Sequence, residues 1–460
     1  MAVHLKLYDK ASSLRADGSR NYVHPADVSG RFDRRRKLSF AVLAALLFAL
    51  PWLQVHGHPA LFIDVQHRCF YLFGATFNAQ DFWLIFFLLT GVGFALIVTT
   101  ALWGRVWCGY ACPQTVFLEG FFRPLERWIE GPRSERLRRN AGPWTLDKVA
   151  RKTLKQAIYL ALAFALAHAF IAYFVSIPGL YAMVQRRPAE HPEAFAWMAA
   201  LTGVLYVNFA WFREQLCLIV CPYGRLQSVL TDQDTLVIGY DNKRGEPRGK
   251  KGKLGAGDCV DCHRCVVVCP TGIDIRNGLQ IDCIGCARCV DACDEVMVKL
   301  GRETGLVRYD SQRGLAGLGR RVLRARIGLY GALGAVGLVV AAWALSTRTP
   351  YEANVLRLRD APPFVVDAGR VRNAFEIHVV NKRGRSAVFE LRPSANDRLH
   401  YTVAMPHIAL PELGGQRIPV FVDFALGAAR SGERGELQLW MDGARVRTLQ
   451  LPLLAPVSEH

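Results

Sequence analysis

Two runs of four cysteines, each spaced C-x2-C-x2-C-x3-C, stand between residues 259 and 293 of the sequence. Bacterial ferredoxins use this spacing to hold two 4Fe-4S clusters, and the fourth cysteine of each run binds the cluster of the other run. The spacing therefore predicts a crossed assignment of ligands. The first cluster is expected on Cys259, Cys262, Cys265 and Cys293, and the second on Cys283, Cys286, Cys289 and Cys269.

Zinc is the main alternative for these cysteines, because two C-x2-C pairs can form an all-thiolate site. A structural zinc ion takes four ligands as two separated pairs, whereas the sequence has two overlapping triplets, each with a further cysteine. A disulfide framework is the other alternative, and it would need an oxidising compartment. One departure from the ferredoxin pattern is that Asp294 follows Cys293, where Pro270 follows Cys269. Iron-sulfur clusters remain the better interpretation.

The composition places much of the remaining chain in a membrane. Of the 460 residues, 51% are apolar, and the formal net charge is +18. A large positive charge is also typical of proteins that bind nucleic acid. Here many of the basic residues lie next to apolar segments, which is where the positive-inside rule puts them in membrane proteins. We therefore expect a membrane-bound chain without a nucleic-acid partner.

Five apolar segments are long enough to be membrane-spanning helices, since about 20 apolar residues cross the hydrocarbon core of a bilayer. They cover residues 38–55, 82–103, 157–177, 194–212 and 327–345. The segment 104–153 carries ten Lys or Arg residues, whereas 56–81 carries one and 178–193 carries two. The positive-inside rule therefore places 104–153 in the cytoplasm. Five crossings then put the N-terminus and the cysteine runs in the cytoplasm, and the tail from residue 346 outside.

Four further cysteines form two C-x3-C-P motifs, each just after an apolar segment: Cys108 with Cys112, and Cys217 with Cys221. Positions i and i+4 share one face of a helix, and proline tends to end a helix, so the four sulfurs could converge. Soft thiolates bind copper(I), zinc or an iron-sulfur cluster. We predict a redox or metal site here, holding copper or a further cluster. The alternative is two unrelated pairs of buried structural cysteines.

His168 lies in the middle of the third apolar segment. Ionisable residues inside a membrane often mark function, so it could be a metal ligand or a haem partner. No second histidine stands at helical spacing from it, which favours the alternative that it is a packed, hydrogen-bonded side chain.

The tail after residue 350 has a different pattern. Apolar and polar residues alternate in 375–379, 420–424 and 436–439, and Gly, Pro, Asn and Asp lie between these stretches. A period of two residues is typical of strands with one buried face, and several such strands predict an antiparallel β-sandwich.

The sequence resembles the FixG, RdxA and CcoG type of cytochrome c oxidase accessory protein. The resemblance covers nearly the whole chain and rests on Trp-Cys-Gly-Tyr-x-Cys-Pro-Gln at 107–114, Cys-Pro-Tyr-Gly-Arg-x-Gln-Ser at 221–228, the segment 234–248 and the paired ferredoxin runs. The membrane and ferredoxin parts are also similar to the membrane ferredoxins that feed periplasmic nitrate and nitrous oxide reductases. The C-terminal immunoglobulin-like domain of the first family favours that family.

The resemblance implies a multi-pass protein of the bacterial inner membrane that is needed to assemble a haem-copper oxidase of the cbb type. Its implied role is the reduction of cupric to cuprous ion. From their position beside the ferredoxin runs and from thiolate chemistry, we predict that Cys108, Cys112, Cys217 and Cys221 form the terminal redox or copper site. Its implied partners are the lipid bilayer, oxidase assembly and copper-delivery proteins, and an unidentified electron donor.

The expected organisation combines a five-helix membrane domain, a ferredoxin module with two clusters and an immunoglobulin-like β-sandwich. Its parts are a basic cytoplasmic tail (1–37), four spans with the two C-x3-C-P motifs (38–229), the cytoplasmic ferredoxin domain (230–312), a fifth span with a basic flank (313–348) and the periplasmic immunoglobulin-like domain (349–460).

Two other functions fit the same residues. One is a general membrane ferredoxin that passes electrons between a cytoplasmic donor or quinone and another respiratory enzyme. The other is a non-catalytic assembly scaffold, in which the clusters only stabilise the fold.

Overall fold

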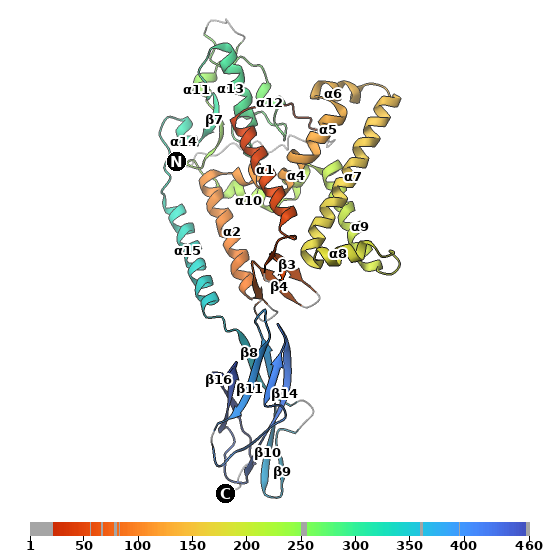
Figure 1. The fold of residues 1–460 in the computed structure, drawn as a ribbon. Helices are drawn as coiled ribbons and strands as arrows, with labels where there is room; N and C mark the ends of the chain where they lie inside the picture. The colour runs from red at the N-terminus through yellow and green to blue at the C-terminus, as the bar shows by residue number, and fades with distance from the viewer. Residues whose placement is uncertain are drawn as a thin grey trace. The chain divides into compact units, whose positions relative to one another are not determined.

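The computed structural model describes residues 22–55, 57–65, 68–77, 81, 83–249, 255–358, 362–394 and 396–456. The chain forms two compact units, and Figure 1 labels many of their elements. One unit contains the residues up to Phe62 together with Phe86–Val340. The other contains Ile63–Ile85 together with the chain from Ala341 onward.

Four helices in the described part of the chain are long and apolar enough to cross a membrane. They are α2 (Trp83–Trp103), α7 (Leu146–Val175), α9 (Pro192–Val207) with its continuation η3 (Asn208–Phe212), and α15 (Ala325–Ser346). Protein covers only a minority of the residues in each apolar window. A long helix that is apolar all round and not covered by protein fits a lipid environment. Four of the five predicted spans are therefore confirmed as helices.

The first predicted span, residues 38–55, is not confirmed. Helix α1 (Arg31–Ala49) begins within the basic cluster and ends before Pro51, whose ring cannot continue a helix. The apolar part of α1, residues 38–49, rises only about 18 Å, whereas the hydrocarbon core of a bilayer is about 30 Å thick. The chain continues as a two-stranded hairpin of β1 (Gln54–Val55) and β2 (His58–Pro59).

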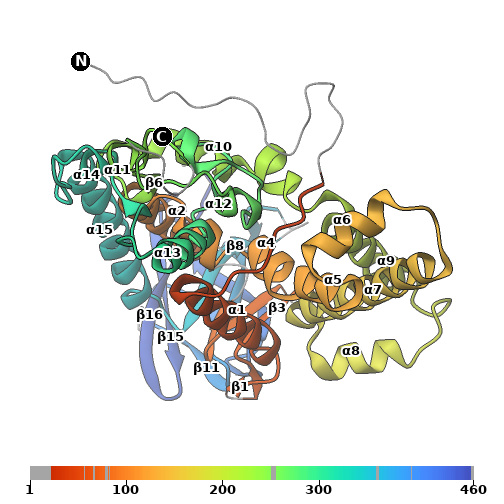
Figure 2. The same cartoon turned by 90° about the horizontal axis from the view of Figure 1, so that it is seen from above.

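In the first unit, α7 and α9 lie side by side, and α5 (Arg123–Glu130) packs against α7 (Figures 1 and 2). Aromatic side chains fill the space between them. The rings of Phe122 and Phe209 stack with centroids 4.4 Å apart, and Tyr159 donates a hydrogen bond to the carbonyl of Phe122. Short helices connect the long ones: α3 (Val106–Tyr110), α4 (Pro113–Phe117), η2 (Leu118–Phe122), α6 (Arg133–Ala141), α8 (Ile177–Val184), η4 (Leu216–Val220) and α10 (Pro222–Leu230).

The cysteine-rich part of the first unit is closed by a two-stranded antiparallel sheet, in which β6 (Val237–Tyr240) pairs with β7 (Val307–Asp310). Between these strands the chain forms α11 (Asn242–Gly245), α12 (Arg264–Val267), η5 (Ile275–Asn277) and α13 (Arg288–Leu300), and α14 (Gln312–Leu315) follows β7. Ile238, Ile275 and Met297 are at most 2% exposed and form a core together with the cysteines.

The segment 22–30 lies against the cysteine-rich part rather than in solvent. Ala26 donates its backbone N–H to the carbonyl of Val267, and the side chain of Val28 is buried. Arg288 donates a hydrogen bond back to the carbonyl of Ala26. Helix α1, which follows, contacts α13 (Figure 2). This part of the predicted polar tail therefore belongs to the folded unit.

The second unit contains a β-sandwich. Its strands are β8 (Tyr351–Arg357), β9 (Val365–Asp367), β10 (Arg370–Asn381), β11 (Ala387–Pro393), β12 (His400–Val403), β13 (His407–Leu410), β14 (Gly415–Ala425), β15 (Arg434–Met441) and β16 (Ala444–Pro452). One sheet has the order β12–β14–β10–β8, with β9 paired to β10, and the other has the order β13–β11–β15–β16. In β10, Val371, Phe375, Ile377 and Val379 are fully buried. The three alternating stretches lie in β10, β14 and β15, which confirms the predicted strands.

A small sheet of β3 (Leu61–Asp64), β4 (Cys69–Leu72) and β5 (Ala75–Phe77) precedes α2. Asp81, which is 2% exposed, pairs with Arg348 at 2.6 Å and with Lys382 at 3.1 Å. Because one buried carboxylate serves both cations, the segment before α2 is tied to the sandwich.

Candidate iron-sulfur and thiol sites

The two cysteine runs share one loop geometry. His263 and Ala287, which each stand between the second and third cysteine of a run, have left-handed backbones with φ of 56° and 59°. A helix, α12 or α13, begins at the following residue in each case. Left-handed residues other than glycine are uncommon, so their recurrence at equivalent positions marks a repeated structure.

The first expected ligand set lines one cavity. The cysteines on its wall are Cys259, Cys262, Cys265 and Cys293. Because Cys293 comes from α13 in the second run, the crossing of the two runs is present in the fold. The structure thus brings these four residues together, and their ligation of a cluster stays a prediction.

The second expected ligand set lines a neighbouring cavity. Its cysteines are Cys269, Cys283, Cys286 and Cys289. Cys265 of the first set borders this cavity as well, so the two cavities share a wall. Apolar side chains such as Ile273 and Ile275 form most of the remaining lining.

The chemistry of these cysteines fits bound iron. Burial raises the pKa of Cys265, Cys283 and Cys293 to about 12. Such a thiol is protonated at neutral pH unless a positive charge stabilises its thiolate. A bound metal supplies that charge, since coordination deprotonates a thiol. Each set of four cysteines therefore fits one 4Fe-4S cluster.

The two C-x3-C-P motifs share a local structure of their own. Cys112 and Cys221 have extended backbones, with ψ of 126° and 111°, and each precedes a proline at the first position of a helix, α4 or α10. The first cysteine of each motif, Cys108 or Cys217, lies in the helical turn before it. Proline suits the first turn of a helix because the missing N–H would have no partner there.

The four thiols of these motifs lie within electrostatic reach of one another, and we name them the four-thiol site. The pKa of Cys217 is raised first by burial and then by the other three thiols. Burial raises the pKa of Cys108 to about 11. The structure thus brings together the cysteines that the sequence paired. Among the described residues, no three His, Cys, Asp or Glu side chains are close enough to hold a single metal ion.

Gln227 is a neighbour of the four-thiol site that sequence reasoning missed. Its side chain on α10 is fully buried, and its amide nitrogen lies 3.5 Å from the sulfur of Cys108. This contact lowers the pKa of Cys108, although burial outweighs it. The sequence indicated this residue only through its place in the Cys-Pro-Tyr-Gly-Arg-x-Gln-Ser stretch at 221–228.

The second cysteine cavity lies directly against the four-thiol site. Gly109 follows Cys108, and Gly285 precedes Cys286. A Cβ atom added at Gly109 would lie 2.9 Å from the carbonyl oxygens of Gly285 and Ile284. The two loops are therefore in backbone contact, and the contact leaves no room for a side chain.

The side chains of two further residues stabilise the contact between the loops of Gly109 and Gly285. Arg105 donates hydrogen bonds to the carbonyl of Ile281 and, at 2.6 Å, to that of Gly224. Tyr309 of β7 donates to the carbonyl of Gly285. Strand β7 and both cysteine loops are thus held together by hydrogen bonds to main-chain carbonyls.

His168 fits the packing interpretation. Its Nδ1 donates a hydrogen bond to the carbonyl of Phe164 at 2.9 Å, and the two rings lie 4.1 Å apart. Among the described residues, no thiol of the four-thiol site forms a hydrogen bond with His168.

Three family descriptions match parts of the chain. Residues 212–312 match a 4Fe-4S dicluster domain, and residues 83–132 match a 4Fe-4S binding domain. Residues 341–450 match an IG-like fold at the C-terminus of FixG. The dicluster match contains both ferredoxin runs, and the two 4Fe-4S matches together contain the four-thiol site. These matches support iron-sulfur clusters in the first unit and an immunoglobulin-like fold for the sandwich.

Named relatives are similar over most of the chain. The chain is 38% identical to the nitrogen fixation protein FixG of Rhizobium meliloti, over 83% of this chain and 81% of FixG. It is 35% identical to protein RdxB of Cereibacter sphaeroides, over 94% of this chain and 95% of RdxB. It is 37% identical to protein RdxA of the same organism, over 81% of this chain and 82% of RdxA. The chain therefore belongs to the FixG and RdxA family of membrane iron-sulfur proteins.

Proposed function

We propose that this protein carries electrons from the ferredoxin-type cysteine sets to the four-thiol site and there reduces cupric to cuprous ion. The product would serve the assembly of a cbb-type haem-copper oxidase. The observation that carries this proposal is the backbone contact between Gly109 and Gly285. The main chains next to the second cysteine set and the four-thiol site meet there with no side chain between them, and electrons pass efficiently only over short distances.

Iron-sulfur clusters bound by the two cysteine sets would supply one-electron transfer. The exposure of the cysteines suggests the direction in which electrons pass through the protein. Cys262 of the first set is exposed, whereas Cys283, Cys286 and Cys289 of the second set are buried. We therefore propose that the electron donor docks near Cys262 and that electrons reach the four-thiol site at Cys108.

Copper is the substrate in this proposal. Each cupric ion gains one electron from the reduced protein and becomes cuprous ion. Soft thiolates prefer cuprous to cupric ion, so the four-thiol site favours the reduced product. The match of residues 83–132 to a 4Fe-4S binding domain supports a second assignment, in which the four-thiol site holds a further cluster and copper binds elsewhere.

The decisive variant replaces Cys108, Cys112, Cys217 and Cys221 by Ser. After reduction with dithionite and removal of the excess, the wild-type protein should reduce added cupric ion, which a cuprous chelator detects by colour. The variant should not. Iron analysis decides what the site holds: about eight irons per chain in both proteins indicate a copper site, and about four fewer in the variant indicate a further cluster.

Cys69→Ser is the matched control, because Cys69 lies in β4 and belongs to none of these motifs. This control should reduce cupric ion as the wild type does. Full reduction by the quadruple variant would refute the four-thiol site and favour a general membrane ferredoxin. Cluster-ligand variants that stay folded and still support oxidase assembly would favour the non-catalytic scaffold.

We also propose an orientation in the bacterial inner membrane. The basic segment between α2 and α7 should be cytoplasmic by the positive-inside rule. Helices α7 and α9 cross twice and return the chain to the same side, so the cysteine-rich part is cytoplasmic as well. Helix α15 crosses once more, which places the β-sandwich in the periplasm, where oxidase assembly and copper-delivery proteins are its proposed partners.

A further inference from the structure

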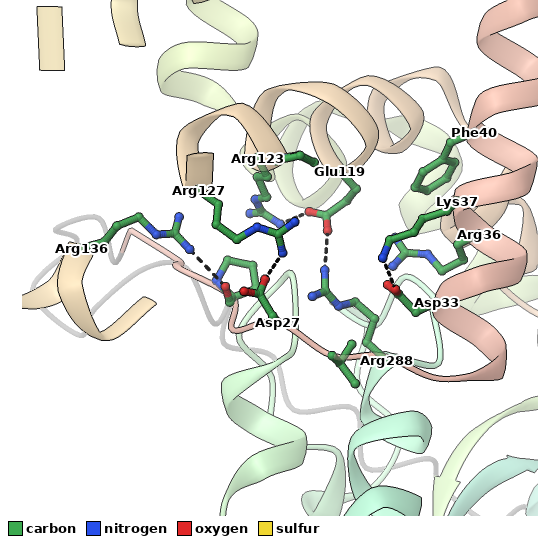
Figure 3. Close-up of a pocket in the computed structure, with 13 residues that line it drawn as sticks. Asp27, Asp33, Arg36, Lys37, Phe40, Glu119, Arg123, Arg127, Arg136 and Arg288 are labelled. Carbon is green, nitrogen blue, oxygen red and sulfur yellow. Dashed lines mark hydrogen bonds and ion pairs between the residues drawn. The ribbon is translucent and has the colours of Figure 1, made fainter. Parts of the chain in front are cut away.

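An open cavity with a strongly basic lining lies beside α1 (Figure 3). Six lining side chains are cations: Arg36, Lys37, Arg123, Arg127, Arg136 and Arg288. Three are carboxylates: Asp27, Asp33 and Glu119. The lining therefore carries an excess of three positive charges. All of these residues belong to the first unit.

The three carboxylates already have cationic partners, which Figure 3 shows. The pairs are Asp27 with Arg127, Asp33 with Lys37, and Glu119 with both Arg123 and Arg288. Arg136 pairs with a carboxylate outside the lining, Glu126, at 3.5 Å. Arg36 forms no ion pair within the described part of the chain. The lining carboxylate that interacts with Arg36 is Glu119, and it already pairs with Arg123 and Arg288.

Several guanidinium groups of the cavity carry buried N–H donors without a hydrogen bond to any described residue. Arg36 is 2% exposed; its Nε donates to the carbonyl of Gly109 at 3.0 Å, while its Nη2 has no partner. Arg123 and Arg136 are 7% and 3% exposed, and the Nε atom of each has no partner either. Buried charged donors without acceptors are costly, so an anion in this cavity would be bound favourably.

We propose that this cavity binds a phosphate group, either in the headgroup of an anionic phospholipid or as free phosphate. Guanidinium groups match phosphate oxygens with paired, charge-assisted hydrogen bonds. Arg36 and Lys37 are the last charged residues of α1 before its apolar part, and Phe40 lines the same cavity. Clusters of Lys and Arg next to a membrane bind anionic lipid headgroups.

A phosphate in this position would join elements that are distant in the sequence. Arg36 belongs to α1, Arg123 to α5 and Arg288 to α13. Arg288 directly precedes Cys289 of the second cysteine set. The bound anion would therefore link the cysteine-rich part to α1 and α5.

The test is calorimetric titration of the detergent-purified, cluster-loaded full chain. The ligands are sodium phosphate, a short-chain phosphatidylglycerol, and a short-chain phosphatidylcholine as the zwitterionic control. Phosphate or phosphatidylglycerol should bind once per chain, and more tightly than phosphatidylcholine. Arg36→Gln should weaken this binding about tenfold or more, because charge-assisted hydrogen bonds are lost. Binding of phosphatidylglycerol alone identifies lipid as the source, and binding of phosphate alone identifies the free anion.

Arg34→Gln is the matched control, since Arg34 is exposed on the same helix and does not line the cavity. It should bind as the wild type does. Iron content shows whether Arg36→Gln is folded. If it is not, Arg127→Gln, whose side chain is 43% exposed, should weaken binding several-fold. The proposal is overturned if neither anion binds, or if Arg34→Gln and the cavity variant lose affinity equally.

Discussion

Gly109 is the residue on which the junction between the cysteine loops depends most. A methyl group there would lie 2.9 Å from two backbone carbonyl oxygens, closer than such atoms normally approach. Gly109→Ala should therefore separate the loops, destabilise the fold by about 1–3 kcal/mol and slow the delivery of electrons to the four-thiol site. Stopped-flow measurement of cupric reduction by the pre-reduced protein would record the slower rate, with iron content unchanged.

Gly203→Ala in α9 is the control for this experiment, because nothing lies within 4 Å of the Cβ position of Gly203. Its rate should equal that of the wild type. If Gly109→Ala is equally fast, electrons do not cross the contact between the two loops.

His24 should give the stability of the folded protein a pH dependence. Burial and then Arg136 lower its pKa from 6.5 to about 4. Between these pH values the unfolded chain binds a proton that the folded chain does not bind. The free energy of unfolding should therefore fall by about 3 kcal/mol as the pH falls across this window. His24→Gln cannot be protonated and should lose this contribution, as denaturant unfolding at about pH 7 and about pH 4.5 would show. Equal losses in both proteins would contradict the assignment to His24.

At the scale of the elements, the β-sandwich has a core of its own, to which Phe375 of β10 belongs. Because this side chain is fully buried, Phe375→Ala should cost about 3–5 kcal/mol. The loss should lower the melting temperature of the β-structure, followed by circular dichroism, without changing the visible absorbance of the clusters. Val388→Ala in β11 is the control, because Val388 is 52% exposed and should change stability little. A parallel loss of cluster absorbance in Phe375→Ala would mean that the two units unfold together.

The elements show where sequence reasoning succeeds and why it stops. The strands were predictable because alternation over one stretch already reflects one buried face, as in β10. The spans α2, α7, α9 and α15 were predictable because hydropathy and length suffice for them. The first span is not confirmed, since hydropathy ignores the proline at position 51, where the helix ends and a turn follows.

The same contrast holds for the site. Ligand spacing within one run is local, so the cysteine sets could be assigned from the sequence, and the crossed sets line the cavities as expected. The contact between Gly109 and Gly285 and the position of Gln227 depend on how distant loops pack. Likewise, the segment 22–30 is polar by composition, yet it packs on the cysteine-rich part, where Arg288 donates a hydrogen bond to it. No local pattern in the sequence reports such long-range packing.

At the scale of the whole molecule, two packings constrain how the chain crosses the membrane. The segment 22–30 packs on the cysteine-rich part, whereas Asp81 pairs with Arg348 and Lys382 of the C-terminal part. In the proposed orientation α15 crosses the membrane once, so we expect the chain to cross once between residues 30 and 81 as well. We expect this crossing in the apolar segment 38–55, in which α1 is followed by a turn at residues 50–52.

We therefore expect tags at the N-terminus, at Gly74 and at the C-terminus of the full chain to differ in their access to protease. Gly74, with φ of 85°, lies in the turn between β4 and β5, where an insertion is tolerated best. Protease added to intact spheroplasts should remove the tags at Gly74 and the C-terminus and leave the N-terminal tag, whereas all three should be removed after permeabilisation with detergent. Removal of the N-terminal tag from intact spheroplasts would show that residues 31–80 do not cross the membrane, and that the segment 22–30 cannot pack on a cytoplasmic cysteine-rich part.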